Sequence, residues 1–297
     1  MKAPDEIRER LQGPVNSLPT IFTRDGEIDH TGIRAAIDRT IENGGNVIML
    51  TWGDSLISLL TDDEVAAVHR TVIDHVGNRA VTIACDNMWG LNKELEFGRY
   101  VRELGFDLYM VRPAAWPGAR GTPETLADYY RAVAAEMRVM FVGDVPLRTC
   151  ELLEDEPSIL AFKEDLGLDY AHEVLMRWGD RWTMVGGGGM RRHHLLWPHG
   201  CNAWLDVFIR CQAEPVLTYW QALQRKDAAA AWAAVMRYEV PLWKQALGVR
   251  YGFHGLMGHA LLEIYGVAPR WRRAPAPNPT DAEMDGLRVF LRDMDLL

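Results

Sequence analysis

The sequence predicts an α/β protein in which a (β/α)8 barrel, or TIM barrel, is followed by a C-terminal helical extension. Eight short apolar runs, rich in β-branched residues, alternate along the chain with segments of helical periodicity. Continuous apolar strands that alternate with helices indicate a parallel sheet covered on its outer face. Eight such units in roughly 225 residues fit a closed barrel. An open doubly wound sheet is less consistent, because no glycine-rich phosphate loop follows the first strand.

The eight apolar runs are the predicted strands of the barrel wall. They cover residues 15–22, 46–51, 80–85, 107–112, 138–143, 158–163, 182–187 and 202–208. Between the first two, apolar residues recur at helical spacing over 33–41, and the helix is expected to end at Gly44. The sequence TDDE at 61–64 is a capping-box pattern, and Pro123 suits the first position of another helix.

Beyond the eighth run the pattern becomes entirely helical. Helices are expected over 213–224, 226–247, 250–265 and 280–295. We therefore expect two parts, a barrel over residues 1–225 and a helical extension over 226–297 that packs on it.

Composition narrows the class of protein. The 297 residues are 48% hydrophobic and carry a net charge of -9, without the basic clusters that nucleic acids or anionic membranes attract. The N-terminus lacks the apolar core of a signal peptide, and no apolar run is long enough to span a membrane, so a cytoplasmic protein is expected. Four separated cysteines without a C-x-x-C pair suggest reduced thiols. We expect no metal and no cofactor.

Lys163 ends the sixth predicted strand, in the stretch SILAFKEDLG. In a (β/α)8 barrel the C-terminal strand ends form the active-site face. A lysine there is partly desolvated by its apolar neighbours, and desolvation favours the neutral amine that acts as a nucleophile. Such a lysine can form a Schiff base. The alternative is a structural lysine paired with Glu164 or Asp165 on the rim.

Several motifs, in order, resemble those of the dihydrodipicolinate synthase / N-acetylneuraminate lyase superfamily. TIFTRDGEID at 20–29 is similar to the family's T-P-F-x-x-D-G-x-I-D, and LLTDDE at 59–64 to its L-T-x-D-E. VPLRT at 145–149 and AFKEDLG at 161–167 resemble V-P-x-R-T and G-I-K-E/D-x-x-G. The resemblance implies a class I aldolase-type barrel that binds 2-keto acids as lysine Schiff bases and assembles as a homotetramer, a dimer of dimers.

The resemblance assigns roles to two matching residues. Lys163 matches the Schiff-base lysine, whose protonated imine would act as an electron sink. Arg148 matches the arginine that meets a carboxylate of the second substrate, and a guanidinium suits a carboxylate because it offers two parallel donors. The alternative for Arg148 is a surface arginine.

Departures from the family are equally informative. The proton-relaying tyrosine is replaced by Gly143, so Asp144 becomes the nearest candidate proton carrier. The Gly-Thr-Thr-Gly-Glu loop that binds the keto-acid carboxylate falls on WGDSL at 52–56, where Asp54 would repel a carboxylate unless paired, and Ser55 could supply a hydroxyl. Trp52 and Trp116 are candidates for narrowing the mouth or for stacking on substrate.

Two functions of different class follow from these observations. The first is a Schiff-base lyase, aldolase or dehydratase that acts on a pyruvate-like 2-keto acid and is not dihydrodipicolinate synthase proper. Lys163 favours it. The second is a catalytically inactive or small-acid-binding homologue of the same fold. Gly143 and the altered WGDSL loop favour that alternative.

Overall fold

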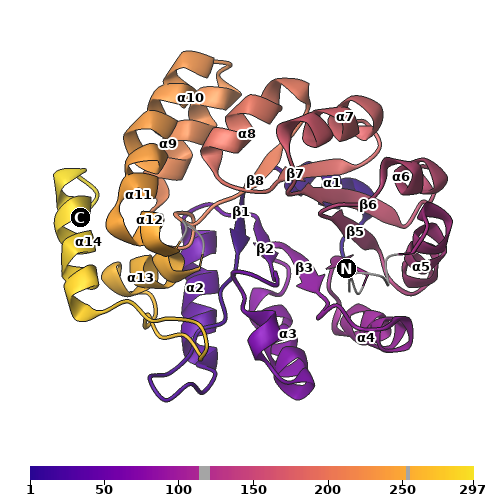
Figure 1. The fold of residues 1–297 in the computed structure, drawn as a ribbon, viewed down its shortest axis with the longest axis horizontal. Helices are drawn as coiled ribbons and strands as arrows, with labels where there is room; N and C mark the ends of the chain where they lie inside the picture. The colour runs from indigo at the N-terminus through magenta and orange to yellow at the C-terminus, as the bar shows by residue number, and fades with distance from the viewer. Residues whose placement is uncertain (114–120, 252–254) are drawn as a thin grey trace.

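A computed structural model describes residues 1–113, 121–251 and 255–297, and within them it shows the predicted closed barrel of eight parallel strands (Figure 1). Neighbouring strands pair in sequence order, and β1 closes the ring by pairing with β8. The strands are β1 (Gly13–Ser17), β2 (Val47–Met49), β3 (Val81–Cys85), β4 (Leu108–Met110), β5 (Val139–Val142), β6 (Ile159–Glu164), β7 (Thr183–Gly186) and β8 (Ala203–Leu205). The prediction of a TIM barrel is confirmed.

Helices follow the strands and cover the outside of the barrel. They are α2 (His30–Glu42), α3 (Asp62–Val76), α4 (Leu91–Leu104), α5 (Pro123–Glu136), α6 (Leu147–Leu153), α7 (Leu168–Trp178) and α8 (Met190–Leu196), with short 3-10 turns η1 (Ile57–Leu59) and η2 (Trp197–His199). The helix-start and helix-end residues predicted from the sequence are found at the ends of the helices. Thr61 and Glu64 form the capping box of α3, Pro123 begins α5, and Gly44 follows α2 with a φ of +87°.

The N-terminal segment lies at the end of the barrel where the strands begin. Helix α1 (Pro4–Arg10) precedes β1, and just before it the Lys2 ammonium donates to the Asp107 carboxylate at 3.0 Å and to the Ala80 carbonyl at 2.7 Å. Ala80 and Asp107 immediately precede β3 and β4. The N-terminal segment therefore lies at the face away from the C-terminal strand ends.

The first strand is shorter than predicted and begins earlier. It covers Gly13–Ser17 rather than 15–22, because Pro19 has no N–H to donate to a neighbouring strand. The chain then leaves the sheet, and Phe22 forms an isolated antiparallel bridge with Ile28. The prediction extended the strand too far because this exit segment is as apolar as the strand itself.

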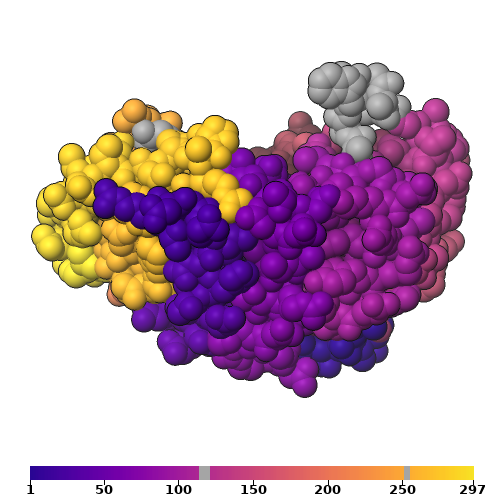
Figure 2. Space-filling model, turned by 90° about the horizontal axis from the view of Figure 1, so that it is seen from below, coloured from indigo at the N-terminus to yellow at the C-terminus, as the bar shows by residue number. Residues whose placement is uncertain are grey.

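The C-terminal region is helical, as expected, and its first helix has the predicted bounds, but the later helices are shorter. They are α9 (Ala213–Gln224), α10 (Ala228–Ala234), the π-helical turn η3 (Val235–Glu239), α11 (Val240–Lys244), α12 (Ala246–Tyr251), α13 (Leu256–Ile264) and α14 (Asp281–Asp293). The helix predicted over 226–247 is interrupted where η3 precedes Pro241, whose ring cannot continue regular hydrogen bonding. Figure 2 shows the end of this region, in yellow, on one flank of the barrel. In the described parts of the chain, every helix falls short of the length or apolar character that a membrane span needs.

Candidate active site

Lys163 lies inside the C-terminal end of the barrel. It is in register with Val142 of β5 and Val185 of β7. The preceding Phe162 packs against Tyr170 of α7, outside the barrel, and strand alternation therefore turns Lys163 inward. Burial raises the pKa of the Cys85 thiol on β3, and the Lys163 charge partly opposes that rise, which places the amine near this strand too. Lys163 is only 6% exposed.

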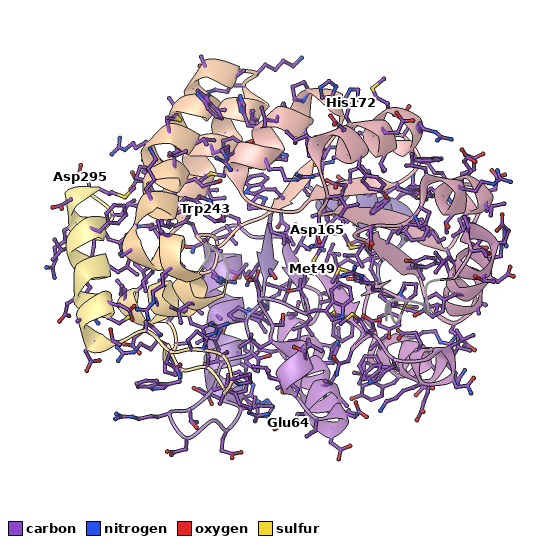
Figure 3. The ribbon with its side chains drawn as sticks, in the orientation of Figure 1. Met49, Glu64, Asp165, His172, Trp243 and Asp295 are labelled. Atoms are coloured by element: carbon purple, nitrogen blue, oxygen red, sulfur yellow. The ribbon has the colours of Figure 1, made fainter. Side chains whose placement is uncertain are left out.

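The partner of the Lys163 amine is the carboxylate of Asp165. The distance from Lys163 Nζ to Asp165 Oδ1 is 2.6 Å. Asp165 follows β6 and lies near the middle of the ring of strands (Figure 3). Gly187 makes room for it, since a Cβ at that position would lie 1.8 Å from Asp165 Oδ1. Glu164, the other acid considered from the sequence, pairs instead with Arg192.

The position of the family's tyrosine is occupied by a glycine that the backbone requires. Gly143 has a φ of +73°, a conformation that residues with a side chain rarely adopt, and its N–H donates to the Lys163 carbonyl at 3.0 Å. Beside it, Arg112 Nη2 donates to Asp144 Oδ1 at 3.0 Å. Arg112 ends the fourth strand's apolar run, and sequence reasoning missed it. The candidate acid Asp144 is thus paired with Arg112, next to the position at which the resembled family has its tyrosine.

Arg148 lies on α6 with its side chain 59% exposed. Its guanidinium pairs with Glu151 at 2.9 Å, and Glu151 also pairs with Arg177 of α7 at 2.6 Å. These two arginines lower the pKa of the Glu151 carboxyl. In this structure, therefore, Arg148 takes part in a surface ion-pair network.

The WGDSL loop is tied to the barrel end by hydrogen bonds. The Ser55 hydroxyl donates to the Leu18 carbonyl and accepts from the Thr51 N–H at 2.8 Å, so it is already engaged with the backbone. Asp54 is buried, with 6% of its surface exposed, and its charge acts on the guanidinium groups of Arg210 and Arg272. The remaining predicted substrate contact, Trp116, lies outside the described residues.

Two buried carboxyl groups beside Trp52 were not anticipated. Asp86 follows β3 and accepts from the Arg112 N–H at 3.1 Å, whereas Glu94 of α4 accepts from the Tyr109 hydroxyl. Each has one further oxygen without a hydrogen-bond partner in the described chain, and the charge of Glu94 adds to the rise in the pKa of Asp86, so the two carboxyls are close neighbours. A proton on one of them would supply a hydrogen bond to the other. Burial raises both pKa values, that of Glu94 to about 7. The only sequence signal was an acid directly after an apolar strand.

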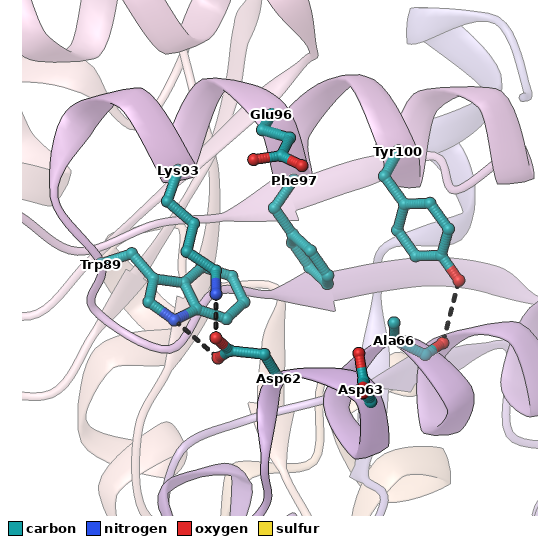
Figure 4. A pocket seen from close by; sticks show the side chains of 8 residues that line it. All are labelled: Asp62, Asp63, Ala66, Trp89, Lys93, Glu96, Phe97 and Tyr100. Carbon is teal, nitrogen blue, oxygen red and sulfur yellow. Dashed lines mark hydrogen bonds and ion pairs between the residues drawn. The ribbon is translucent and has the colours of Figure 1, made fainter.

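A separate cavity of about 250 Å³ lies outside the barrel, between α3 and α4 (Figure 4). Its polar groups largely satisfy one another. The Asp62 carboxylate accepts from the Trp89 indole N–H at 3.1 Å and from the Lys93 ammonium, and the Tyr100 hydroxyl donates to the Ala66 carbonyl at 3.0 Å. This cavity is a contact region between two helices and holds none of the predicted site residues.

Comparisons with known proteins agree with this geometry. Residues 10–219 match the model of the dihydrodipicolinate synthetase family. A 4-hydroxy-tetrahydrodipicolinate synthase of Nitratidesulfovibrio vulgaris is 28% identical over 206 residues, 65% of this chain and 69% of that one. The same-named protein of Methanococcus maripaludis is 30% identical over 158 residues, 52% of this chain and 53% of its own length.

Solved structures show the same fold at low identity. A family protein of E. coli K12 in complex with pyruvate has a TM-score of 0.82 at 18% identity, over 96% of this chain and 99% of that one. The N-acetylneuraminate lyase of Fusobacterium nucleatum has a TM-score of 0.80 at 17% identity, with the same two coverages. Because the family model matches more than two thirds of the sequence, this chain belongs to the dihydrodipicolinate synthetase family.

Proposed function

We propose that this chain is an aldolase-type lyase or dehydratase that binds a pyruvate-like 2-keto acid as a Schiff base on Lys163. The observation that carries the proposal is the Lys163 amine, buried inside the active-site end of the barrel and hydrogen-bonded to Asp165 at 2.6 Å. Family membership supports the same chemistry, and one structural neighbour is described in complex with pyruvate.

Asp165 is positioned to move the protons that imine formation requires. The Lys163 ammonium first transfers a proton to Asp165, and the neutral amine attacks the ketone carbon. Proton transfer from nitrogen to oxygen then gives the carbinolamine. Asp165 returns its proton to the carbinolamine hydroxyl, which leaves as water while the C=N bond forms. The net reaction joins ammonium and ketone to give a protonated imine and one water.

The substrate beyond the keto acid is proposed to differ from that of the synthases. Their relay tyrosine is absent at Gly143, and Arg112 and Asp144 form an ion pair beside that position. A carboxylate at Asp54 replaces one of the two threonines of the carboxylate-binding loop. Both changes alter groups that contact substrate in the resembled family, whereas the lysine is kept. Asp144 and Arg148 remain proposed as second acid and carboxylate contact.

Borohydride trapping tests the proposal directly. The protein is incubated with pyruvate, reduced, and examined by intact-protein mass. We expect one reduced adduct per chain, its loss in Lys163→Ala, and its retention in Lys244→Ala, which removes an exposed lysine. Asp165→Asn should slow labelling while leaving the adduct on Lys163. No adduct from folded protein would favour the alternative of a small-acid-binding homologue.

Assembly and location form part of the same proposal. We propose a homotetramer, built as a dimer of dimers, in the cytoplasm, with small organic acids rather than nucleic acid or membrane as partners. Sedimentation velocity at micromolar concentration checks the assembly, and a monomer would contradict it.

A further inference from the structure

A group of cationic side chains lies over the ends of β1, β2 and β8. Arg210 follows β8 and is 1% exposed, and its Nη1 donates to the Ser17 carbonyl at the end of β1 at 2.5 Å. Burial lowers the pKa of Arg210 and of Arg272, and the charge of Asp54, which follows β2, partly opposes both shifts, so Asp54 lies close to both. Arg272 comes from the C-terminal region and is half-buried. Strand ends and the C-terminal region thus meet at this point.

Both guanidiniums lie against the first turn of α13. A Cβ on Gly258 would lie 2.0 Å from Arg210 Nη2, and one on Gly255 would lie 3.2 Å from Arg272 Nη2. Gly255 is the N-cap residue and provides no side-chain cap. The start of a helix presents unpaired N–H groups and a positive partial charge. Two cations at such a place repel it and each other, and Asp54 acts on both as a counter-charge.

His259, on the same turn, has no partner for either ring nitrogen among the described residues, although it is 1% exposed. Burial, then Arg272 and Arg210, lower the pKa of His259 to about 3, so its ring is neutral and offers one donor. Arg210 Nε and Arg272 Nε likewise lack a partner in the described chain. Buried donors without an acceptor are rare in folded proteins, because each loses its hydration without compensation.

Two carboxylates, those of Asp54 and Asp206, lie near these cations. Asp206 accepts from the Trp204 indole and from the Phe208 and Ile209 N–H groups, so both its oxygens are engaged. Asp54 attracts both arginines, yet burial outweighs it and lowers the pKa of Arg210 and of Arg272. A further anion at this cluster would accept hydrogen bonds from the donors of Arg210, Arg272 and His259 that have no partner in the described chain.

We propose that Arg210, Arg272, His259 and the first turn of α13 bind a second carboxylate of the substrate. The inference rests on the proposed Schiff base at Lys163. Lys163 comes from β6, and the cluster from β1, β2 and β8, on another part of the same barrel wall. A ligand that contacts both Lys163 and this cluster would have its ketone at one end and a carboxylate at the other. The substrate class is a 2-keto dicarboxylic acid.

The test compares two five-carbon acids that differ at one end. 2-Oxoglutarate carries a terminal carboxylate where 2-oxovalerate carries a methyl group, and both are trapped with borohydride over a concentration series. We expect half-maximal labelling at about tenfold lower 2-oxoglutarate, the scale of one charge-assisted hydrogen bond. Arg272→Gln should abolish this preference, so that the half-maximal concentrations of the two acids become equal. Arg272→Lys should retain part of it, and Arg131→Gln, an exposed arginine on α5, all of it.

The outcomes separate the two proposals. Equal labelling by both acids would keep the Schiff base and overturn the second-carboxylate site, as would a preference that survives in Arg272→Gln. If Arg272→Gln does not fold, His259→Phe is measured instead, with the same expected loss of preference. If neither acid labels Lys163, the Schiff-base proposal fails. Calorimetric binding of glutarate to Lys163→Ala then decides, because Arg272-dependent binding supports the cluster as a carboxylate site and its absence overturns it.

Discussion

Replacing Glu94 by glutamine should make the protein more stable at alkaline pH and should leave it nearly unchanged at acidic pH. Glu94 is fully buried beside Asp86, and a protonated Glu94 would share its proton with that carboxylate. Glutamine keeps an oxygen for the Tyr109 hydroxyl and offers an amide N–H to Asp86. It therefore mimics the protonated glutamate that the folded protein prefers.

The size of the effect follows from linkage. Burial raises the pKa of Glu94 from 4.5 to about 7, so the folded protein binds more protons than the unfolded chain between these values. The contribution of this raised pKa to the free energy of unfolding is fully present below pH 4.5. It is lost as the pH rises to 7, and the loss reaches about 3 kcal/mol. Above pH 7 the loss is constant. Glu94→Gln should remove most of this pH dependence.

Thermal unfolding of wild type and variant at pH 5 and pH 8 measures the difference. The control is Glu96→Gln, an exposed position on the same helix, which should follow wild type at both pH values. Equal melting temperatures of wild type and Glu94→Gln at pH 8 would refute the shared-proton interpretation. So would a stabilisation of the same size at both pH values, since that would have another cause.

Two further predictions concern the loop after β7 and its surroundings. Glu239 is buried, accepts from the Arg191 N–H at 3.1 Å, and has its pKa raised to about 7, so Glu239→Gln should raise the melting temperature at pH 8 more than at pH 5. Gly187→Ala would put a methyl group 1.8 Å from Asp165 Oδ1, and it should slow borohydride labelling with pyruvate about tenfold. Gly53→Ala, whose Cβ would meet nothing within 4 Å, should label like wild type. Normal labelling of Gly187→Ala would show that Asp165 does not assist the amine.

The fold could be predicted because its signals are local. Strand position follows from short apolar runs, and helix starts follow from caps such as Thr61 and Pro123. The errors arose where a local pattern continued beyond its element. The apolar segment after Ser17 leaves the sheet, and the helical pattern around Pro241 is divided by a π-helical turn. In each place a proline, Pro19 or Pro241, was the local signal that the prediction passed over.

The site was predictable only in part, because most of its contacts join distant segments. The position of Lys163 at the end of the sixth strand could be predicted from its motif, and the structure places it there. The contact of Arg210 with Ser17 spans 193 positions, and only barrel closure brings them together. His259 belongs to a helix whose position over the barrel no sequence period indicates. From the sequence, Asp165 was considered only as an ion-pair partner of Lys163 on the rim. Its position inside the barrel depends on Gly187, which has no side chain to occupy that space.

The proposed Schiff-base chemistry would not depend on the tyrosine of the resembled family. Gly143 has a positive φ, so a tyrosine cannot be restored there without strain, and Arg112 lies beside the position. Asp165 is two residues from Lys163, so strand β6 and its following loop fix the acid relative to the amine. No group from the far side of the barrel is needed for that contact. We infer that imine formation and recognition of the substrate's other end are carried by separate segments, and that the second can change while the first is kept.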